Sequence, residues 1–119
     1  MAIKGMDISV FQSNISVANF KKAKNAGIQF VILRLGYTGS SKLECKIDSV
    51  FENNYKNALA AGLPIGIYYY SLANSKSEAR REAEFTIKHL QDKKITWPVY
   101  IDMEDSAYRQ YKCSKATLA

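Results

Sequence analysis

Four short apolar segments alternate with three amphipathic segments along the chain, and this alternation limits the folds that the sequence can adopt. The apolar segments are Ala2 to Val10, Ile28 to Leu35, Pro64 to Leu72 and Trp97 to Met103. The last three are rich in Ile, Val and Tyr and lack a regular polar alternation, which is typical of parallel strands covered on both faces. Lys4 and Asp7 interrupt the first segment, which is the weakest of the four strand patterns.

The amphipathic segments carry signals for the two ends of a helix. Ser16 is a candidate N-cap for the first helix, and Gly27 is a candidate end. Asp48 is a candidate N-cap for the second helix, and Ser75 with Glu78 forms a candidate capping box for the third. The side chains expected to face inward are Val17, Phe20 and Ala23, then Phe51, Tyr55, Ala58 and Leu59, then Ala79, Ala83, Thr86 and Leu90.

The order of these elements is strand and helix in strict alternation, with about 30 residues per unit, as in βαβ units. Such an order predicts an α/β domain with a parallel sheet. The length of 119 residues, of which 47% are hydrophobic, suits a single folded domain over residues 1–119. Two architectures fit: an open doubly wound sheet, or about four units of a (β/α) barrel of the TIM type, which is an incomplete or half barrel.

Composition narrows the classes of function. The net charge of +6 favours anionic partners such as nucleic acid, an acidic membrane or a bacterial wall polymer. Lysines are scattered without a basic, aromatic-rich stripe, so we expect no nucleic-acid binding. We find no apolar run long enough to span a membrane and no signal-peptide pattern. Cys45, Cys113 and His89 are too few for a four-ligand zinc site, and we expect both thiols to be reduced.

In both architectures, functional residues gather at the carboxyl ends of the parallel strands. Polar and aromatic side chains stand at each of the four predicted ends. They are Asp7, Ser9 and Gln12, then Arg34, Gly36 and Tyr37, then Tyr68 to Ser71, and finally Asp102, Glu104 and Asp105. None of these ends carries the glycine-rich pattern of a nucleotide-binding loop.

Asp102 and Glu104 are the most informative pair. On a strand they point to one face with Cα atoms about 7 Å apart. Neighbouring carboxyls drive their pKa values apart, so that one can act as a general acid while the other stays ionised, as glycosidic-bond cleavage requires. Asp7, at the end of the first predicted strand, would add a third carboxyl group at the same edge of the sheet. A solvated acidic loop is the alternative, and we expect Arg34 to pair with Asp7 or Asp102.

Tyr68 and Tyr70 share one face of the third predicted strand, because side chains alternate along a strand. Aromatic rings with hydroxyl groups suit the apolar faces and polar rims of sugars. With Arg34 they are our candidate substrate-binding residues, although the two tyrosines also suit a structural role with hydrogen-bonded hydroxyls.

These motifs together resemble the family 25 glycoside hydrolases, the lysozyme-like N-acetylmuramidases of bacteria and phages. The resemblance extends over nearly the whole chain, with the motifs in the same order and spacing. The motifs are Gly5 to Gln12, Ala26 to Arg34, the spaced Asp48, Phe51 and Asn54, Ala60 to Tyr68, and Trp97 to Asp105.

The resemblance implies a modified (β/α) barrel that hydrolyses the β-1,4 bond between N-acetylmuramic acid and N-acetylglucosamine in peptidoglycan. Glu104 matches the family's proton donor, and Asp102 matches the carboxylate that positions the substrate's 2-acetamido group for attack on the anomeric carbon. Asp7 matches the catalytic carboxylate of the first strand, and Tyr68 matches a tyrosine of the sugar cleft. No metal or cofactor is implied.

Members of the family continue for several more strands, so we expect this chain to be the N-terminal part of the catalytic domain, and to be inactive alone. The alternative is a non-catalytic wall-binding half barrel that self-associates through open sheet edges. A chitinase-like hydrolase is a weaker possibility, because its longer run of alternating aspartates is missing. We expect action on the cell wall, reached through a phage holin, by lysis or by an unrecognised route.

Overall fold

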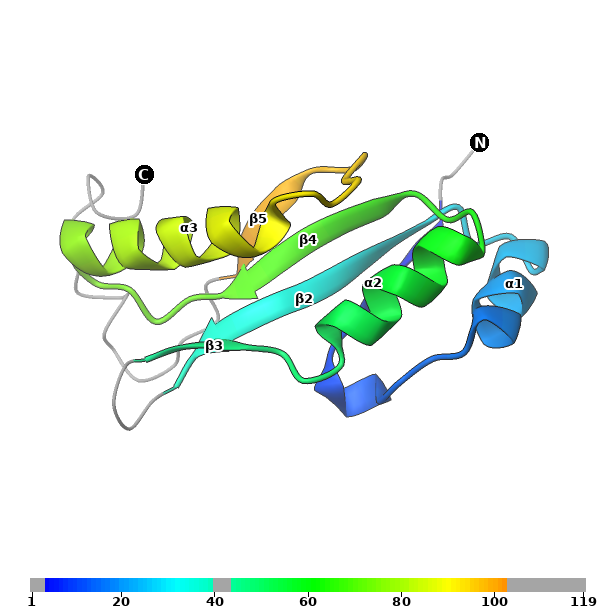
Figure 1. Cartoon of the computed structure of the whole chain (residues 1–119), viewed down its shortest axis with the longest axis horizontal. Helices are drawn as coiled ribbons and strands as arrows, with labels where there is room; N and C mark the ends of the chain where they lie inside the picture. The colour runs from blue at the N-terminus through cyan, green and yellow to red at the C-terminus, as the bar shows by residue number, and fades with distance from the viewer. Residues whose placement is uncertain (1–3, 40–43, 103–119) are drawn as a thin grey trace.

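The computed structural model describes residues 4–39 and 44–102 of the chain. These residues form one five-stranded sheet and three α-helices (Figure 1). The strands are β1 (Gly5–Ile8), β2 (Phe30–Thr38), β3 (Cys45–Ile47), β4 (Ile65–Tyr70) and β5 (Val99–Asp102). The helices are α1 (Val17–Asn25), α2 (Phe51–Ala60) and α3 (Lys76–Leu90), with a short 3-10 helix, η1, over Val10–Gln12.

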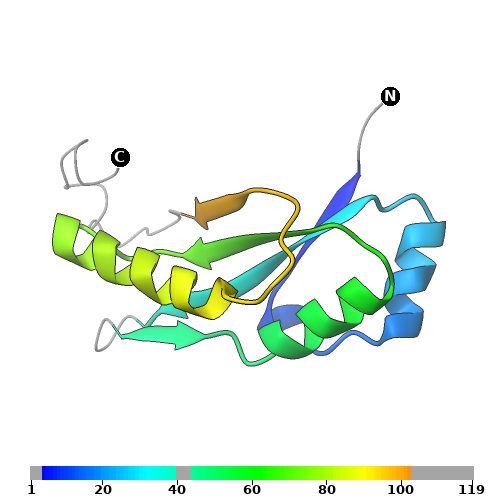
Figure 2. The same ribbon diagram turned by 45° about the horizontal axis from the view of Figure 1, so that its top comes forward.

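The parallel strands follow one another across the sheet in chain order, β1-β2-β4-β5. The three α-helices lie on one face of the sheet (Figures 1 and 2). A doubly wound sheet reverses its strand order and carries helices on both faces, so the singly wound arrangement of a (β/α) barrel is the one that this chain adopts. The sheet is not closed within the described residues: β1 and β5 end the row of parallel strands, and β3 pairs with β2 alone.

The hydrophobic core fills the helix side of the sheet. Alternate residues of β2 and β4 are buried there, whereas Ile32, Arg34 and Tyr68 on the other face are only partly covered. The core side chains with at most 3% exposure are Ile8, Phe20, Val31, Leu33, Leu35, Phe51, Ala58, Leu63, Ile65, Ile67 and Tyr69. The opposite face is therefore available for a site. Each helix within the described ranges is too short or too polar to cross a membrane.

The first and third helices begin as predicted. The Ser16 hydroxyl accepts a hydrogen bond from the Asn19 backbone N–H at 3.1 Å, and the Ser75 hydroxyl accepts one from the Glu78 N–H at 3.2 Å. Gly27 follows α1 with a φ of 110°, a left-handed conformation that glycine adopts without steric cost.

Three details of the helices differ from the prediction. The N-cap of α2 is Val50, because Asp48 belongs to the turn before the helix. Leu59 is 40% exposed, whereas Asn54 is buried because its amide bonds to the preceding loop. In α3 the most buried residues are Glu82 and Thr86, and the predicted inward position Ala83 is exposed.

The sequence pattern gave no indication of β3. This three-residue strand pairs antiparallel with the end of β2, with Gly36 opposite Ile47. Three residues are too few to display a hydrophobic period, so only the pairing defines the strand. Pairing with β3 extends β2 to Thr38, beyond the predicted end at Leu35.

Close approach of β3 to β2 makes Gly36 a sensitive position. A Cβ atom at Gly36 would lie 2.3 Å from the Lys46 carbonyl oxygen, whereas at Gly39 its nearest neighbour is the flexible Lys46 side chain at 3.4 Å. We expect Gly36→Ala to lower the free energy of unfolding by about 1–3 kcal/mol through overpacking. Gly39→Ala is the control and should change stability little. Urea denaturation measures both, and equal stabilities would contradict the proposed crowding.

Candidate active site

An open cavity of about 490 Å³ lies on the face of the sheet that carries no helix. Its lining residues come from all four parallel strands, and they are Asp7, Ile32, Tyr68, Tyr100 and Asp102. The register places Ile32 beside Asp7, and Tyr68 beside Tyr100. Two of the three predicted carboxylates and one of the two predicted tyrosines therefore line the same cavity.

Among the described site residues, Tyr70 and Arg34 do not line the cavity. Tyr70 is half-buried, is paired in register with Asp102, and is not among the described residues that line the cavity. Glu104 lies outside the described residues, two positions after the end of β5, as does Cys113. Cys45 is a free thiol within the described residues.

The pKa of Tyr68 depends on several charged residues of the site. Burial raises the pKa of its phenol above the ordinary value of 10.0. The positive charge of Arg34 and a hydrogen bond with the Ser9 side chain lower this pKa, while the negative charges of Asp7 and Asp102 raise it. The phenol is consequently protonated at neutral pH, and it can donate a hydrogen bond to a ligand.

The partner of Arg34 corrects the prediction. Its Nε donates a hydrogen bond to Asp48 Oδ2 at 2.8 Å, in an ion pair whose side chains are 11% and 0% exposed. The expected pairing with Asp7 or Asp102 is wrong because the unpredicted β3 continues to Asp48, whose N–H bonds the Leu35 carbonyl at 2.8 Å. The antiparallel pairing thereby brings the Asp48 carboxylate to Arg34.

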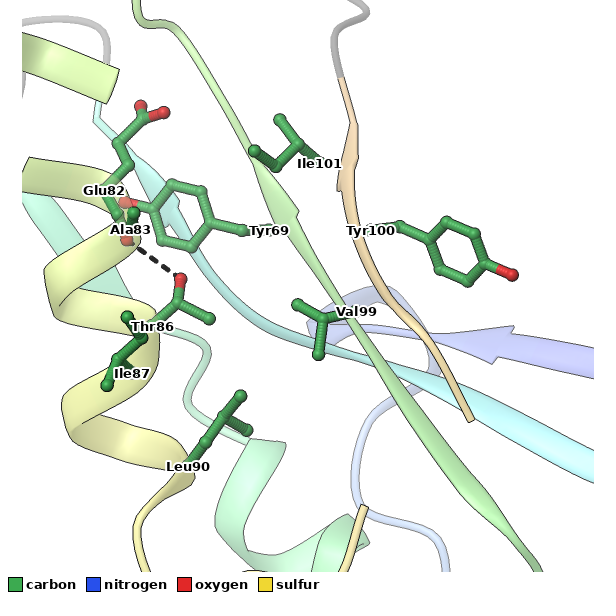
Figure 3. Close-up of a pocket in the computed structure, with 9 residues that line it drawn as sticks. All are labelled: Tyr69, Glu82, Ala83, Thr86, Ile87, Leu90, Val99, Tyr100 and Ile101. Carbon is green, nitrogen blue, oxygen red and sulfur yellow. Dashed lines mark hydrogen bonds between the residues drawn. The ribbon is translucent and has the colours of Figure 1, made fainter. Parts of the chain in front are cut away.

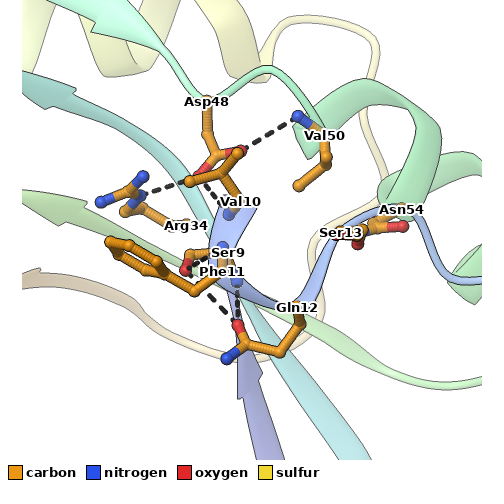
Figure 4. A network of polar contacts seen from close by, with 9 residues as sticks. All are labelled: Ser9, Val10, Phe11, Gln12, Ser13, Arg34, Asp48, Val50 and Asn54. Atoms are coloured by element: carbon orange, nitrogen blue, oxygen red, sulfur yellow. Dashed lines mark hydrogen bonds and ion pairs between the residues drawn. The ribbon is translucent and has the colours of Figure 1, made fainter.

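Asp48 also fixes the loop that follows β1 (Figure 4). The same Oδ2 accepts a hydrogen bond from the Val10 N–H at 2.9 Å, and Oδ1 accepts one from the Val50 N–H at 3.0 Å. One buried carboxylate thus connects β2, the turn before α2 and the loop beside the cavity. In the sequence analysis Asp48 was a helix cap, because a long-range partner leaves no local pattern.

Two asparagines of α2 hold the continuation of this loop. Asn54 accepts a hydrogen bond from the Ile15 N–H at 2.7 Å and donates one to the Ser13 carbonyl at 3.1 Å. Asn57 donates to the Ile15 carbonyl at 2.8 Å. The spaced Asp48 and Asn54 that the sequence analysis singled out are therefore residues that position a loop.

The first turn of this loop is the 3-10 helix η1, whose N-cap is Ser9. The Ser9 hydroxyl accepts from the Phe11 N–H, and the Gln12 side-chain oxygen accepts from the Ser9 N–H at 2.7 Å. This reciprocal pair is a capping box. The spacing of Ser9 and Gln12 was a signal in the sequence that could have predicted the turn.

A second cavity, of about 290 Å³, lies on the helix side between α3 and β5. Figure 3 shows Val99 and Ile101 on the side of β5 that faces α3, whereas the ring of Tyr100 points away from it. The lining is mostly apolar, and Glu82 is its one acidic side chain among the described residues. Strand β5 therefore separates an apolar cavity from the face that carries the carboxylates.

The Glu82 carboxylate is 5% exposed and fully hydrogen-bonded. It accepts from the Thr38 hydroxyl at 2.6 Å, the Ser71 hydroxyl at 2.5 Å and the Leu72 N–H at 3.1 Å. It thus fastens the ends of β2 and β4 to α3. The burial of Glu82 was not predicted, since a glutamate within a helix indicates a solvated position.

A singly wound α/β sheet with carboxylates at the carboxyl ends of its strands is the arrangement of the glycoside hydrolases that are built on (β/α) barrels. The sequence model described as Glycosyl hydrolases family 25 matches residues 6–118. This chain belongs to that family.

Solved structures of two proteins are similar to this chain. One is the modular autolysin LytC from Streptococcus pneumoniae in complex with a synthetic peptidoglycan ligand, with 29% identity and a TM-score of 0.73 over 86% of this chain and 22% of that one. The other is a muramidase from Trichobolus zukalii, with 30% identity and a TM-score of 0.71 over 98% of this chain and 54% of that one. The chain therefore spans about a fifth of the autolysin and about half of the muramidase. No curated protein matches the sequence.

The ion pair of Arg34 gives a prediction for stability. Asp48→Ala leaves a poorly solvated guanidinium and two backbone N–H groups without their acceptor, so we expect it to lower the free energy of unfolding by about 3–5 kcal/mol. Glu52→Ala removes an ion pair with Lys93 in which the Glu52 side chain is 60% exposed, and it should cost less than about 1 kcal/mol. Urea denaturation compares the two, and a similar small cost for both would contradict the role of Asp48.

The charges around Tyr68 give a second prediction. Asp7→Asn and Asp102→Asn each remove a negative charge that raises the phenol pKa, so each should lower that pKa. Asp92→Asn, an exposed residue after α3, is the control and should leave it unchanged. Titration of ¹³C-labelled tyrosines by NMR, assigned with Tyr68→Phe, measures the shift. An unchanged or raised pKa in both site variants would show that these carboxylates do not face Tyr68.

Proposed function

We propose that this chain supplies the catalytic site of a muramidase that cleaves the β-1,4 bond between N-acetylmuramic acid and N-acetylglucosamine in peptidoglycan. The main support is the convergence of Asp7, Asp102 and Tyr68 on one cavity in a chain of family 25. We also propose that the chain forms the N-terminal portion of the catalytic domain and acts at the cell wall. The match to about half of the Trichobolus zukalii muramidase supports this proposal.

In this mechanism Glu104 is the general acid. It donates its proton to the glycosidic oxygen while the bond from that oxygen to the anomeric carbon breaks. The carbonyl oxygen of the substrate's own 2-acetamido group attacks the anomeric carbon, and Asp102 accepts a hydrogen bond from the acetamido N–H. Water then opens the cyclic intermediate and returns a proton to Glu104, so the anomeric configuration is retained.

The charges of the cavity suit this chemistry. Glycoside cleavage develops positive charge at the anomeric carbon, and the carboxylates of Asp7 and Asp102 stabilise it. Arg34 is engaged with Asp48, so it does not form its ion pair with either carboxylate. The negative charge of the cavity is thereby kept for the transition state.

The aromatic residues of the same cavity suit the sugar itself. Tyr68 and Tyr100 are neighbours on β4 and β5, and their rings offer apolar surface to a pyranose ring. The protonated Tyr68 hydroxyl can donate to a sugar or acetamido oxygen. We also assign substrate contact to Tyr70 and place Arg34 as a residue that orders the rim of the cavity.

Incubation with purified peptidoglycan tests the proposal. Two proteins are compared: the 119-residue chain, and the same chain extended by the part of the muramidase that it does not cover. We expect the extended protein to release glycan fragments with new N-acetylmuramic acid reducing ends, identified by mass spectrometry. Glu104→Gln and Asp102→Asn should each reduce the rate by about 10²–10⁴-fold, which is the usual contribution of acid–base catalysis.

The matched control is Glu84→Gln, since Glu84 is an exposed residue of α3 outside the cavity. It should keep the full rate. Full activity in Glu104→Gln would refute the assignment of the acid. Binding of peptidoglycan without hydrolysis by either protein would refute the enzymatic proposal and support a wall-binding module. Sedimentation of the 119-residue chain then reveals whether such a module is a dimer.

A further inference from the structure

Phe11 is the most exposed large apolar side chain within the described residues, at 82%. It lies in η1, directly after the strand that carries Asp7. A ring this exposed buries little apolar surface, so the hydrophobic effect on folding does not account for its position. Exposed aromatic rings beside a ligand cavity are typical contact surfaces for sugars.

The backbone that carries Phe11 is held in place. Its own N–H bonds the Ser9 hydroxyl at 3.3 Å, and the neighbouring Val10 N–H bonds the buried Asp48 carboxylate at 2.9 Å. The capping box of Ser9 and Gln12 closes the turn around it. A ligand that contacts the ring therefore does not have to order the loop, which lowers the entropic cost of binding.

Arg34 connects the Phe11 ring to a residue that lines the cavity, and Figure 4 shows the ring beside Arg34. The guanidinium carbon of Arg34 lies 5.6 Å from the centroid of the Phe11 ring and 4.7 Å from that of Tyr37. Arg34 is paired in register with Tyr68, whose hydroxyl bonds the Ser9 side chain. The cation orients one face of the phenyl ring toward itself, so the solvent-exposed face is presented to a ligand.

We propose that Phe11 is a stacking platform for a second sugar of the glycan, beside the sugar that occupies the cavity. This inference rests on the proposed function, because it assigns an outer subsite to the same cleft. The ligand class is an N-acetylhexosamine residue, whose apolar ring face packs on the phenyl ring. Phe11 is a binding residue here and takes no part in bond cleavage.

Titration of the 119-residue chain with the tetramer of N-acetylglucosamine, followed by NMR, tests the platform. Phe11→Ala should weaken binding by about 3- to 10-fold, the range expected for one aromatic contact. Phe11→Trp should restore or strengthen it. The control is Ile87→Ala, because Ile87 is 63% exposed on α3, on the other side of the sheet. It should leave the affinity unchanged.

Thermal unfolding of the same variants separates binding from folding. Phe11→Ala should keep the midpoint of the wild-type chain, since the ring is exposed, so that weaker binding reports lost contact. Equal affinities of Phe11→Ala and wild type would overturn the platform and leave the muramidase proposal intact. If Phe11→Ala weakens binding but the extended protein does not hydrolyse peptidoglycan, the platform stands and the enzymatic proposal is refuted. A chain that binds neither the tetramer nor peptidoglycan would refute both.

Discussion

The buried ion pair between Arg34 and Asp48 is the interaction on which the geometry of the site depends. The Asp48 side chain is fully buried and bonds three groups that belong to β2, to the loop after β1 and to the turn before α2. A buried pair of this kind adds little net stability over an apolar contact, because both charges lose their hydration. Its value is positional: each of its partners is fixed at one end of the sheet, where the ligand cavity opens.

The parts of the fold that depend on local pattern were predictable from the sequence. Ser16, Ser75 and Gly27 mark helix ends because a cap is a contact within one turn. Asp7 and Asp102 were predictable as members of one site because parallel strands align their carboxyl ends. The partner of Arg34 was not predictable, since it depends on the antiparallel register of β3. The burial of Glu82 was not predictable either, because its partners Thr38 and Ser71 lie at the ends of two different strands.

The two faces of the sheet have different roles: one carries a structural polar network, and the other carries the candidate active site. On the helix side, Glu82 accepts hydrogen bonds from Thr38 and Ser71, which lie at the ends of β2 and β4. On the other side, the same strands carry Arg34 and Tyr68 toward the cavity. The hydrogen bonds of Glu82 on the helix side therefore also help to hold the candidate active site in place on the opposite face. Substitutions on the far face are expected to alter the site through the strand ends.

The agreement between strand order and chain order has a consequence for how the protein is made. During synthesis, each new parallel strand meets a neighbour that has already left the ribosome, so pairing never waits for a distant segment. Each parallel pairing joins strands that are one strand–helix unit apart, so its loop-closure entropy is smaller than that of a pairing between the two ends of the chain. The strands that line the cavity are consequently added one at a time, in chain order. The strand that carries Asp7 is the first of them to be synthesised, and the strand that carries Asp102 is the last.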